Sequence, residues 1–268
     1  MPTTLVLRVA GALQSWGTRS HFARRDTERE PTLSGIIGMI TNGMGYRRED
    51  SLKRFADLTM ASRTDRAGTL VDDFYTAGVG AWHGGTTDED RLYWTAWTST
   101  DGTPNFPKDA DSAKGNIGMK HYLADAIFLV LLTSDDPKLI DDCAHALRTP
   151  RRAYYLGRRG CIPEQPLVCA ITAERPEVLL RSWPWLDHEE QHNAAHQDLA
   201  AGRSRQLPVL ETAVMGDPLA EVRPDVPLRF DSLHREYRTR LVRRSLVPLT
   251  TAMLQAPADA VAQEGEPA

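Results

Sequence analysis

Seven consecutive apolar residues, Ala126 to Leu132, form the longest unbroken apolar run in the chain and lie inside the apolar segment His121 to Thr133. A helix that spans a bilayer needs roughly 18 or more such residues, so the sequence predicts no membrane span and no membrane partner. The run is the strongest strand signal in the chain, although the pattern alone leaves a buried helix open. Because the first residues also lack the features of a signal peptide, we expect a cytoplasmic protein.

Two amphipathic helices and several strands are predicted around this segment. Apolar residues recur at three- to four-residue spacing from Thr32 to Gly45, and again from Pro137 to Leu147. Strands are expected at residues 4–9, 59–63, 69–79, 121–133 and 167–172, with a short additional helix at residues 51–58. Without that short helix, the order strand, helix, strand, strand, helix, strand is that of a ferredoxin-like split βαβ unit.

The predicted fold class is therefore α+β, with a ferredoxin-like domain at residues 1–172. Within it, the glycine-rich and acidic stretch 80–118 surrounds the aromatic residues Tyr93, Trp94 and Trp97 and predicts a protruding hairpin. A smaller β-rich region is expected at residues 173–255, with strand candidates at 205–214 and 228–247. The composition of residues 256–268 predicts a disordered acidic tail.

Basic residues are segregated along the chain although its net charge is −4. Residues 143–163 hold five arginines and no acid, and residues 229–249 hold six arginines against Asp231 and Glu236. Local basic stripes in a mildly acidic chain favour specific contact with a polyanion. A GC-rich genome would give the same arginine bias for no functional reason, and both explanations stay open at this point.

Neither a metal nor another cofactor is predicted. The three cysteines, Cys143, Cys161 and Cys169, form no C-x-x-C pair. Residues 188–192 read His-Glu-Glu-Gln-His, which formally matches the zinc peptidase pattern. Because this motif lies in a polar run, a solvated helix or loop is the preferred interpretation.

The trio Lys120-His121-Tyr122 precedes the central strand and could either catalyse RNA cleavage or bind RNA. A histidine can abstract a ribose 2′-hydroxyl proton, and a lysine can stabilise the phosphorane that forms. Adjacent strand residues point to opposite faces, so both can serve one site only if the backbone bends there. A nucleic-acid contact or a strand edge is the favoured interpretation.

Two further clusters have residue types suited to RNA. In Tyr154 to Cys161, two tyrosines could stack on unpaired bases, Arg158 and Arg159 could bind phosphates, and Gly157 and Gly160 permit close backbone approach. The alternative is a basic solvated turn. A second cluster joins residues 14–17, Arg24, Arg25 and residues 31–35. Its helix N-terminus could bind an anion, and N-capping by Thr32 or Ser34 explains the same residues equally well.

Four of these motifs, taken in order and spacing, resemble the CasD family of type I-E CRISPR Cascade subunits in the RAMP superfamily. The motifs are residues 11–17 with the Arg24-Arg25 loop, residues 31–38, residues 122–128 and residues 155–161. The resemblance spans most of residues 4–170 and is weak beyond about residue 173.

This resemblance implies an RNA-recognition-type ferredoxin-like domain with a thumb hairpin within residues 80–118. It implies a non-catalytic subunit that binds the 5′ handle of the CRISPR RNA, beside the large subunit and the first backbone subunit, with target DNA nearby. The residues expected to contact RNA are Gln14, Trp16, Arg24, Arg25, Thr32, Ser34, Gly35, Lys120, His121, Tyr122, Tyr155, Gly157, Arg158 and Arg159.

A related branch, the type I-C subunit, resembles the chain in general plan and implies a different activity. That branch cleaves precursor RNA without a metal by means of a tyrosine, a lysine and a histidine. Tyr46, Lys120 and His121 lie where these residues could fall. Because a separate subunit cleaves the precursor in type I-E systems, binding without catalysis is the preferred prediction, with an endoribonuclease as the alternative.

Overall fold

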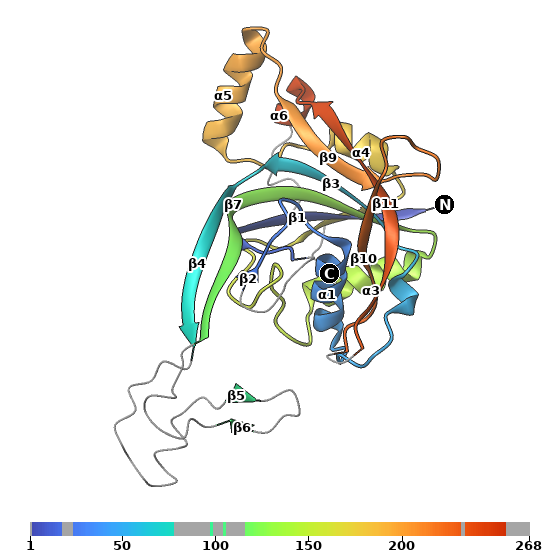
Figure 1. Ribbon diagram of the computed structural model, residues 1–268. Helices are drawn as coiled ribbons and strands as arrows, with labels where there is room; N and C mark the ends of the chain where they lie inside the picture. Colours follow the sequence, from blue (N-terminus) through green and yellow to red (C-terminus); the bar gives the residue numbers. More distant parts are fainter. Residues whose placement is uncertain are drawn as a thin grey trace.

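A nine-stranded sheet forms the centre of the molecule in the computed structural model, which describes residues 2–17, 24–77, 97–98, 104–105, 116–231 and 234–255 (Figure 1). The main strands follow the order β10-β11-β9-β3-β7-β1-β8, and β2 and β4 pair with β7 off this path. All of these ladders are antiparallel except β2–β7. The sheet strands are β1 (Thr3–Gln14), β2 (Arg24–Arg25), β3 (Thr59–Arg66), β4 (Thr69–Ala77), β7 (Asn116–Ser134), β8 (Val168–Thr172), β9 (Gln206–Thr212), β10 (Glu221–Arg229) and β11 (Glu236–Pro248).

Helices cover both faces of this sheet. They are α1 (Leu33–Met44), α3 (Pro137–Arg148), α4 (Pro176–Ser182), α5 (Glu189–Ala200) and α6 (Thr251–Gln255), with the 3₁₀ turn η1 (Lys53–Phe55). Two short strands, β5 (Trp97–Thr98) and β6 (Pro104–Asn105), pair separately within the segment predicted as a hairpin. Most of residues 80–118, and the predicted tail 256–268, lie outside the described residues.

The apolar run of β7 is explained by burial on both faces. Phe128, Val130 and Leu132 pack with α1 and α3 in one core cluster. Leu129 and Leu131 point the other way and pack with α4 in a second cluster. A strand that is covered on both sides needs no polar alternation, because side chains on both faces leave water. The predicted strand at 121–133 is therefore confirmed, and it is longer than expected.

Helix α1 begins and ends as its sequence predicts. The Thr32 hydroxyl accepts a hydrogen bond from the Gly35 amide at 3.1 Å, so Thr32 is the N-cap. Gly45 ends the helix with a φ of 86°, in the left-handed region that favours glycine. The Leu33 amide also donates to the Asp225 carboxylate at 3.0 Å. This contact fixes the helix against β10.

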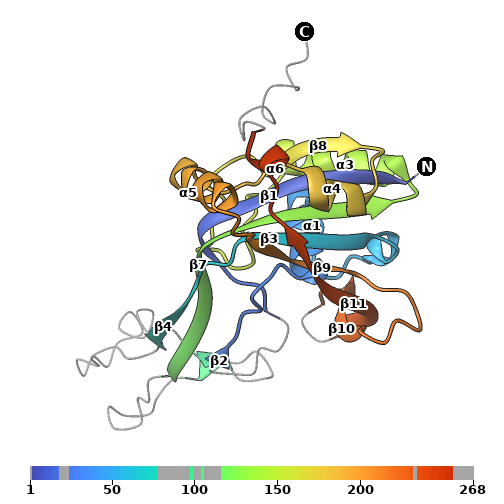
Figure 2. The same cartoon turned by 90° about the horizontal axis from the view of Figure 1, so that it is seen from above.

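A bend in β7 redirects its first half away from the sheet. Asp125 has a φ of 57°, and β7 pairs with β3 after this residue and with β4 before it. Opposite the bend, Gly68 has a φ of 67° and lies so close that a Cβ there would be 2.5 Å from the Ala124 oxygen. The two-stranded ribbon of β4 and β7 consequently projects from the body (Figures 1 and 2).

Three sequence predictions differ from the structure. The helix expected at residues 51–58 is only the 3₁₀ turn η1. The residue before this turn is Leu52, and its amide donates to the Leu228 oxygen at 3.0 Å. The strand expected at 228–247 is divided between β10 and β11, which form a hairpin. Strands β9 to β11 also extend the same sheet, through the pairing of β9 with β3. The boundary at residue 172 stays a prediction.

Candidate nucleic-acid interface

A basic groove of about 790 Å³ opens between α1, the loop that follows α3, and the β10–β11 hairpin. The described residues that line it include six arginines and no aspartate or glutamate. These arginines are Arg47, Arg48, Arg152, Arg158, Arg159 and Arg235. Four aromatic residues, Tyr46, Tyr155, Phe230 and Tyr237, line it as well, beside the buried Trp16. Such a combination suits single-stranded nucleic acid, because arginines bind phosphates and aromatic rings stack on bases.

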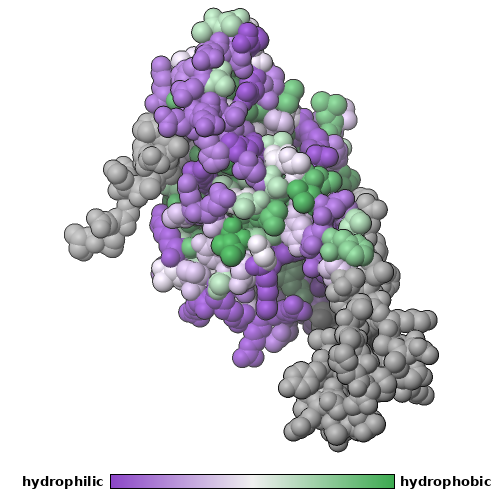
Figure 3. Space-filling view, turned by 90° about the vertical axis from the view of Figure 1, so that its left-hand side faces the viewer, coloured by the Kyte–Doolittle hydropathy of each residue, from purple (hydrophilic) through white to green (hydrophobic). Residues whose placement is uncertain are grey.

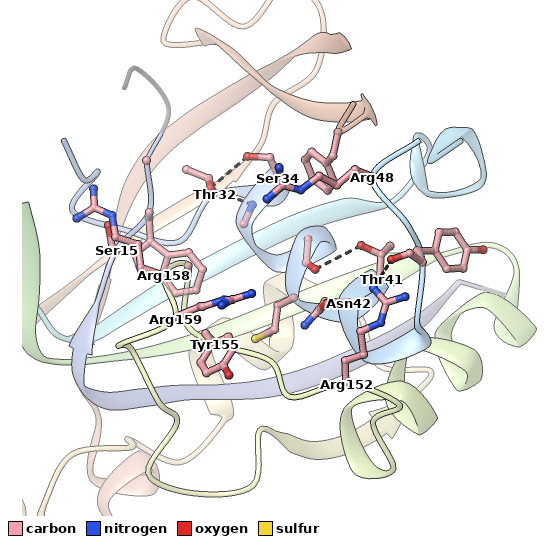
Figure 4. A pocket seen from close by; sticks show the side chains of 18 of the residues that line it. Ser15, Thr32, Ser34, Thr41, Asn42, Arg48, Arg152, Tyr155, Arg158 and Arg159 are labelled. Atoms are coloured by element: carbon pink, nitrogen blue, oxygen red, sulfur yellow. Dashed lines mark hydrogen bonds between the residues drawn. The ribbon is translucent and has the colours of Figure 1, made fainter. Parts of the chain in front are cut away.

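The α1 wall of the groove is made mostly of small residues. Thr32, Ser34, Gly35 and Gly38 line it. In the view of Figure 4, Thr32 and Ser34 face Arg159 and Tyr155 across the groove. Small side chains let a ligand approach the helix closely. The free amides expected at this helix N-terminus are partly used, because Gly35 donates to Thr32 and Leu33 donates to Asp225. N-capping therefore accounts for Thr32, and the buried Asp225 carboxylate disfavours an anion at the helix end.

The opposite wall is the loop at residues 149–163, and Gly157 fixes its position. This residue has a φ of 94°, and a Cβ there would lie 1.7 Å from the Ser15 oxygen. Next to it, the Ser15 amide donates to the Leu156 oxygen at 3.0 Å. Only glycine permits so close a contact at that φ. Gly157 therefore lets the loop pack against the end of β1. This packing explains the glycine at that position by structure alone.

Arg158 and Arg159 are adjacent in sequence but have different surroundings. Arg158 donates to the carbonyl oxygens of His121 at 3.0 Å and Arg25 at 2.8 Å, and its guanidinium lies 4.9 Å from the centre of the Tyr122 ring. It thus ties the loop to β7 and β2. Arg159 is exposed and lines the groove. Arg159 is the better candidate for a phosphate contact, whereas Arg158 positions the loop.

Arg152 is a third basic residue on this wall. It donates to the carbonyl oxygens of Gly45 at 2.7 Å and Tyr46 at 2.9 Å. These acceptors carry no formal negative charge, so they do not offset the positive charge of the guanidinium that caps the end of α1. Arg152 therefore contributes positive charge to the groove in a fixed position.

Gln14 and Trp16 are buried, so their side chains cannot contact RNA as the sequence analysis expected. Both are fully buried. The Trp16 indole donates to Gln14 Oε1 at 3.0 Å, and Gln14 donates in turn to the Ala126 oxygen at 2.6 Å. The ring also lies against α1, since a Cβ on Gly35 would be 2.7 Å from it. We therefore reassign this pair to support of the groove wall.

The trio Lys120-His121-Tyr122 lies on β7, outside the groove. The His121 ring is buried, with Nδ1 2.5 Å from Asp72 Oδ1 and Nε2 3.3 Å from Asp26 Oδ1. Lys120 Nζ lies 4.0 Å from the centre of the Tyr75 ring and 3.9 Å from Asp73. The two side chains therefore contact residues on opposite faces of β4, as strand alternation predicts.

Tyr46 does not join these two residues. It lines the groove, and neither Lys120 nor His121 does. Its ring makes an edge contact with Phe55, with ring centroids 5.9 Å apart. The described residues thus do not bring Tyr46, Lys120 and His121 into one pocket.

Arg24 and Arg25 form β2, which pairs with β7 at Met119 and Lys120. The side chain of Arg24 lies outside the described residues, and that of Arg25 is exposed.

Residues Tyr93 and Trp94 of the predicted arm also lie outside the described residues. The ribbon that leads to the arm exposes Leu70, Phe74 and Met119. On that side of the molecule hydrophilic residues predominate, with smaller apolar areas near the middle (Figure 3).

Several residues of the groove were not predicted from the sequence. They are Asn42, Arg47, Arg48, Arg152, Phe230, Arg235 and Tyr237. The pair Arg47-Arg48 directly follows a predicted helix, so its position near that helix end could have been inferred. Phe230 and Tyr237 lie almost 200 residues away in sequence from α1, and no local pattern connects them to it.

The possible zinc motif has a structural role instead. His188 precedes α5 and His192 lies within it. The His192 ring stacks on Trp185 with centroids 5.0 Å apart, and its Nε2 lies 3.0 Å from the Trp185 oxygen. Among the described residues, no group of three or more potential ligands could hold a metal ion. Burial also raises the pKa of the Cys161 thiol, which disfavours a thiolate there.

No helix within the described part of the chain is long and apolar enough to cross a membrane. The fold is a mixed α/β protein built on an antiparallel sheet, with a basic groove at its edge. Comparison with known proteins identifies its family: the model described as CRISPR-associated protein (Cas_Cas5) matches residues 4–243. The chain therefore belongs to the Cas5 family of CRISPR-associated proteins.

Three relatives agree with this assignment. The CRISPR system Cascade subunit CasD of Escherichia coli (strain K12) is 31% identical over 172 residues, which are 62% of this chain and 70% of that protein. A chain of a solved CRISPR RNA-guided surveillance complex has a TM-score of 0.68 at 31% identity, covering 93% of this chain and 92% of that one. A crystal structure of a Cas protein has a TM-score of 0.61 at 25% identity, covering 91% and 95%. The predicted family is confirmed.

Proposed function

We propose that this chain is a non-catalytic subunit of a CRISPR RNA-guided antiviral surveillance complex, in which it binds and caps the 5′ handle of the CRISPR RNA. The basic groove carries the proposal. Its described lining combines arginines and aromatic rings without a carboxylate, and this combination suits single-stranded RNA. The similarity to a Cascade subunit and to a chain of an RNA-guided complex supports the same function.

The partners that we propose are the large subunit and the first backbone subunit, with target DNA nearby in the assembled complex. A cytoplasmic location is part of this proposal. We also propose an RNA-recognition-type ferredoxin-like domain in residues 1–172, with a thumb within residues 80–118. The projecting ribbon of β4 and β7 supports the thumb, because it leads directly into that segment.

The geometry of the possible catalytic residues supports binding over cleavage. A general base must reach the ribose hydroxyl that it deprotonates. His121 is buried between Asp72 and Asp26, on a strand outside the groove. Lys120 contacts the other face of β4. RNA in the groove would therefore contact Tyr46 but neither Lys120 nor His121.

The test is to incubate the purified full chain with its CRISPR repeat RNA in EDTA and to follow binding and cleavage together. We expect saturable binding by fluorescence anisotropy and intact RNA on a denaturing gel. His121→Ala should leave both results unchanged, and Tyr46→Phe should leave the RNA equally intact. The control is an unrelated duplex RNA of equal length, which should bind more weakly.

Two outcomes would contradict the proposal. Absence of saturable binding by the full chain would remove the RNA-binding function. Site-specific cleavage that disappears in His121→Ala at undiminished affinity would identify the endoribonuclease instead, because general acid-base catalysis typically contributes roughly 10²- to 10⁴-fold in rate.

A further inference from the structure

The tip of the β10–β11 hairpin brings aromatic and basic side chains to the groove from a region distant in sequence. Phe230, Arg235 and Tyr237 line the groove together with α1. Tyr237 is 40% exposed, whereas Phe230 is partly buried against the main core. Tyr237 is therefore the ring that a ligand in the groove can reach.

The Phe230 ring contacts Tyr237 and also lies beside α1. The ring centroids of Phe230 and Tyr237 are 6.3 Å apart with an interplanar angle of 62°, which is an edge-to-face arrangement. A Cβ on Gly38 would lie 3.5 Å from the Phe230 ring, so the ring rests beside the α1 backbone. A ring that is already oriented loses little entropy when a base stacks on it.

The hairpin is also fixed to the α1 wall by polar contacts. Asp225 on β10 accepts from the Leu33 amide at 3.0 Å and from Arg240 at 2.7 and 3.0 Å. The Leu52 amide donates to the Leu228 oxygen at 3.0 Å. The bond between Leu33 and Asp225 therefore joins the hairpin directly to α1. The groove thus has an aromatic wall opposite the basic loop that contains Arg159.

We propose that the hairpin tip is a base-stacking wall, in which Tyr237 stacks on one unpaired base of the bound RNA and Arg235 contacts a neighbouring phosphate. The inference rests on the proposed function of the groove and adds how the groove selects its ligand. A base within a duplex has both faces covered by its neighbours, so it cannot stack on a side chain. The wall therefore favours single-stranded over double-stranded RNA.

The experiment measures the affinity of full-length variants for single-stranded CRISPR repeat RNA by fluorescence anisotropy. Tyr237→Leu should weaken binding about 5- to 150-fold, the range expected for loss of one base–aromatic stack. Tyr237→Phe keeps the ring and should bind like the unchanged chain. Leu246→Ala is the matched control, because Leu246 is an exposed apolar residue of β11 that does not line the groove.

A second measurement reports base stacking directly, so that a loss of stacking can be distinguished from a loss of folding. RNAs that carry 2-aminopurine at successive positions should show quenched fluorescence at one position with the unchanged chain and with Tyr237→Phe, but not with Tyr237→Leu. Thermal unfolding of each variant checks that the hairpin is intact. The salt dependence of affinity should be the same for Tyr237→Leu and the unchanged chain, since no phosphate contact is lost.

The possible failures are distinguishable. If Tyr237→Leu binds as tightly as Tyr237→Phe while Arg159→Ala weakens binding, the stacking wall is wrong and the RNA groove stands. If the unchanged chain does not bind the RNA at all, the proposed function itself fails. Equal affinity for single-stranded and duplex RNA would also overturn the inference.

Discussion

The two arginine-rich segments have similar composition but opposite electrostatic surroundings. In residues 143–163, Arg152 and Arg158 donate to main-chain carbonyls, and Arg159 lines the groove. In residues 229–249, four of the six arginines form ion pairs with carboxylates. These are Arg238 with Asp57, Arg240 with Asp225, Arg243 with Glu211 and Arg244 with Glu30.

The difference shows that an arginine cluster in a sequence does not by itself define a polyanion site. The carboxylates that neutralise the second segment come from distant parts of the chain, such as Glu30 and Asp57. Only the fold brings them to β11. In the first segment, Arg152 and Arg158 donate to carbonyl oxygens, which carry no negative charge that would offset theirs. Arg235 joins the groove because it lies at the hairpin tip.

The largest expected effect is a loss of folding stability, which we expect for an arginine of the second segment and not for one of the first. Arg240 and Asp225 form a buried bidentate pair, with side chains 8% and 0% exposed. Arg240→Ala would leave the Asp225 carboxylate buried without its charged partner, which typically costs about 3–5 kcal/mol in the free energy of unfolding. Urea denaturation measures this cost. Arg159→Ala is the control and should change stability by less than about 0.5 kcal/mol, since Arg159 is exposed.

An equal loss of stability in both variants would contradict the difference between the two segments. It would mean that the first segment is also held by internal contacts and is not available to a ligand.

Periodicity and capping signals predicted much of the fold. Thr32 and Gly45 define α1 as expected, and the run Ala126 to Leu132 is a strand. The sequence did not predict the bend at Asp125 or the extension of the sheet by β9. Both depend on pairings between strands that are far apart in the chain, and no local pattern encodes such pairings.

The candidate site was predicted in part. Residues Tyr155 and Arg159 line the groove with Thr32 and Ser34, as their motifs suggested. Trp16 was expected to contact RNA, but its indole donates to the buried Gln14 side chain in the core. Aromatic and basic residue types indicate what a side chain can do, whereas its burial decides whether a ligand can reach it.

The second expected effect sharpens the comparison within the first segment. Arg159→Ala should weaken RNA binding and reduce the slope of log affinity against log salt by about 0.7, the value for one lost phosphate contact on a single strand. Arg158→Ala should instead loosen residues 152–163, because Arg158 bonds the carbonyls of His121 and Arg25. Faster hydrogen exchange of that loop in Arg158→Ala, and not in Arg159→Ala, is the measurement.

An unchanged salt slope in Arg159→Ala would show that this arginine faces a neighbouring subunit or solvent. The double variant, Arg158→Ala with Arg159→Ala, should combine the weaker binding with the looser loop.

The smallest expected effect concerns pH and the second segment. Burial raises the pKa of the Glu30 carboxyl, but the hydrogen bond from Arg244 and the charges of Arg223 and Arg244 outweigh it, so the pKa lies below its ordinary value of 4.5. The folded chain therefore binds this proton less readily than the unfolded chain does. Its contribution to stability is present above about pH 4.5 and is lost as the pH falls through the lower, folded-state pKa.

Glu30→Gln should therefore flatten the loss of stability below pH 4.5, measured by urea denaturation at successive pH values. Glu221→Gln is the matched control: Glu221 lies 3.5 Å from the same Arg244, but its side chain is 52% exposed. Solvent screens so exposed a pair, and its removal should leave the pH profile nearly unchanged. If both variants flatten the profile equally, the ion pairs of β11 act as a diffuse surface charge. Among the ion pairs of residues 229–249, only the buried pair of Arg240 would then distinguish this segment from residues 143–163.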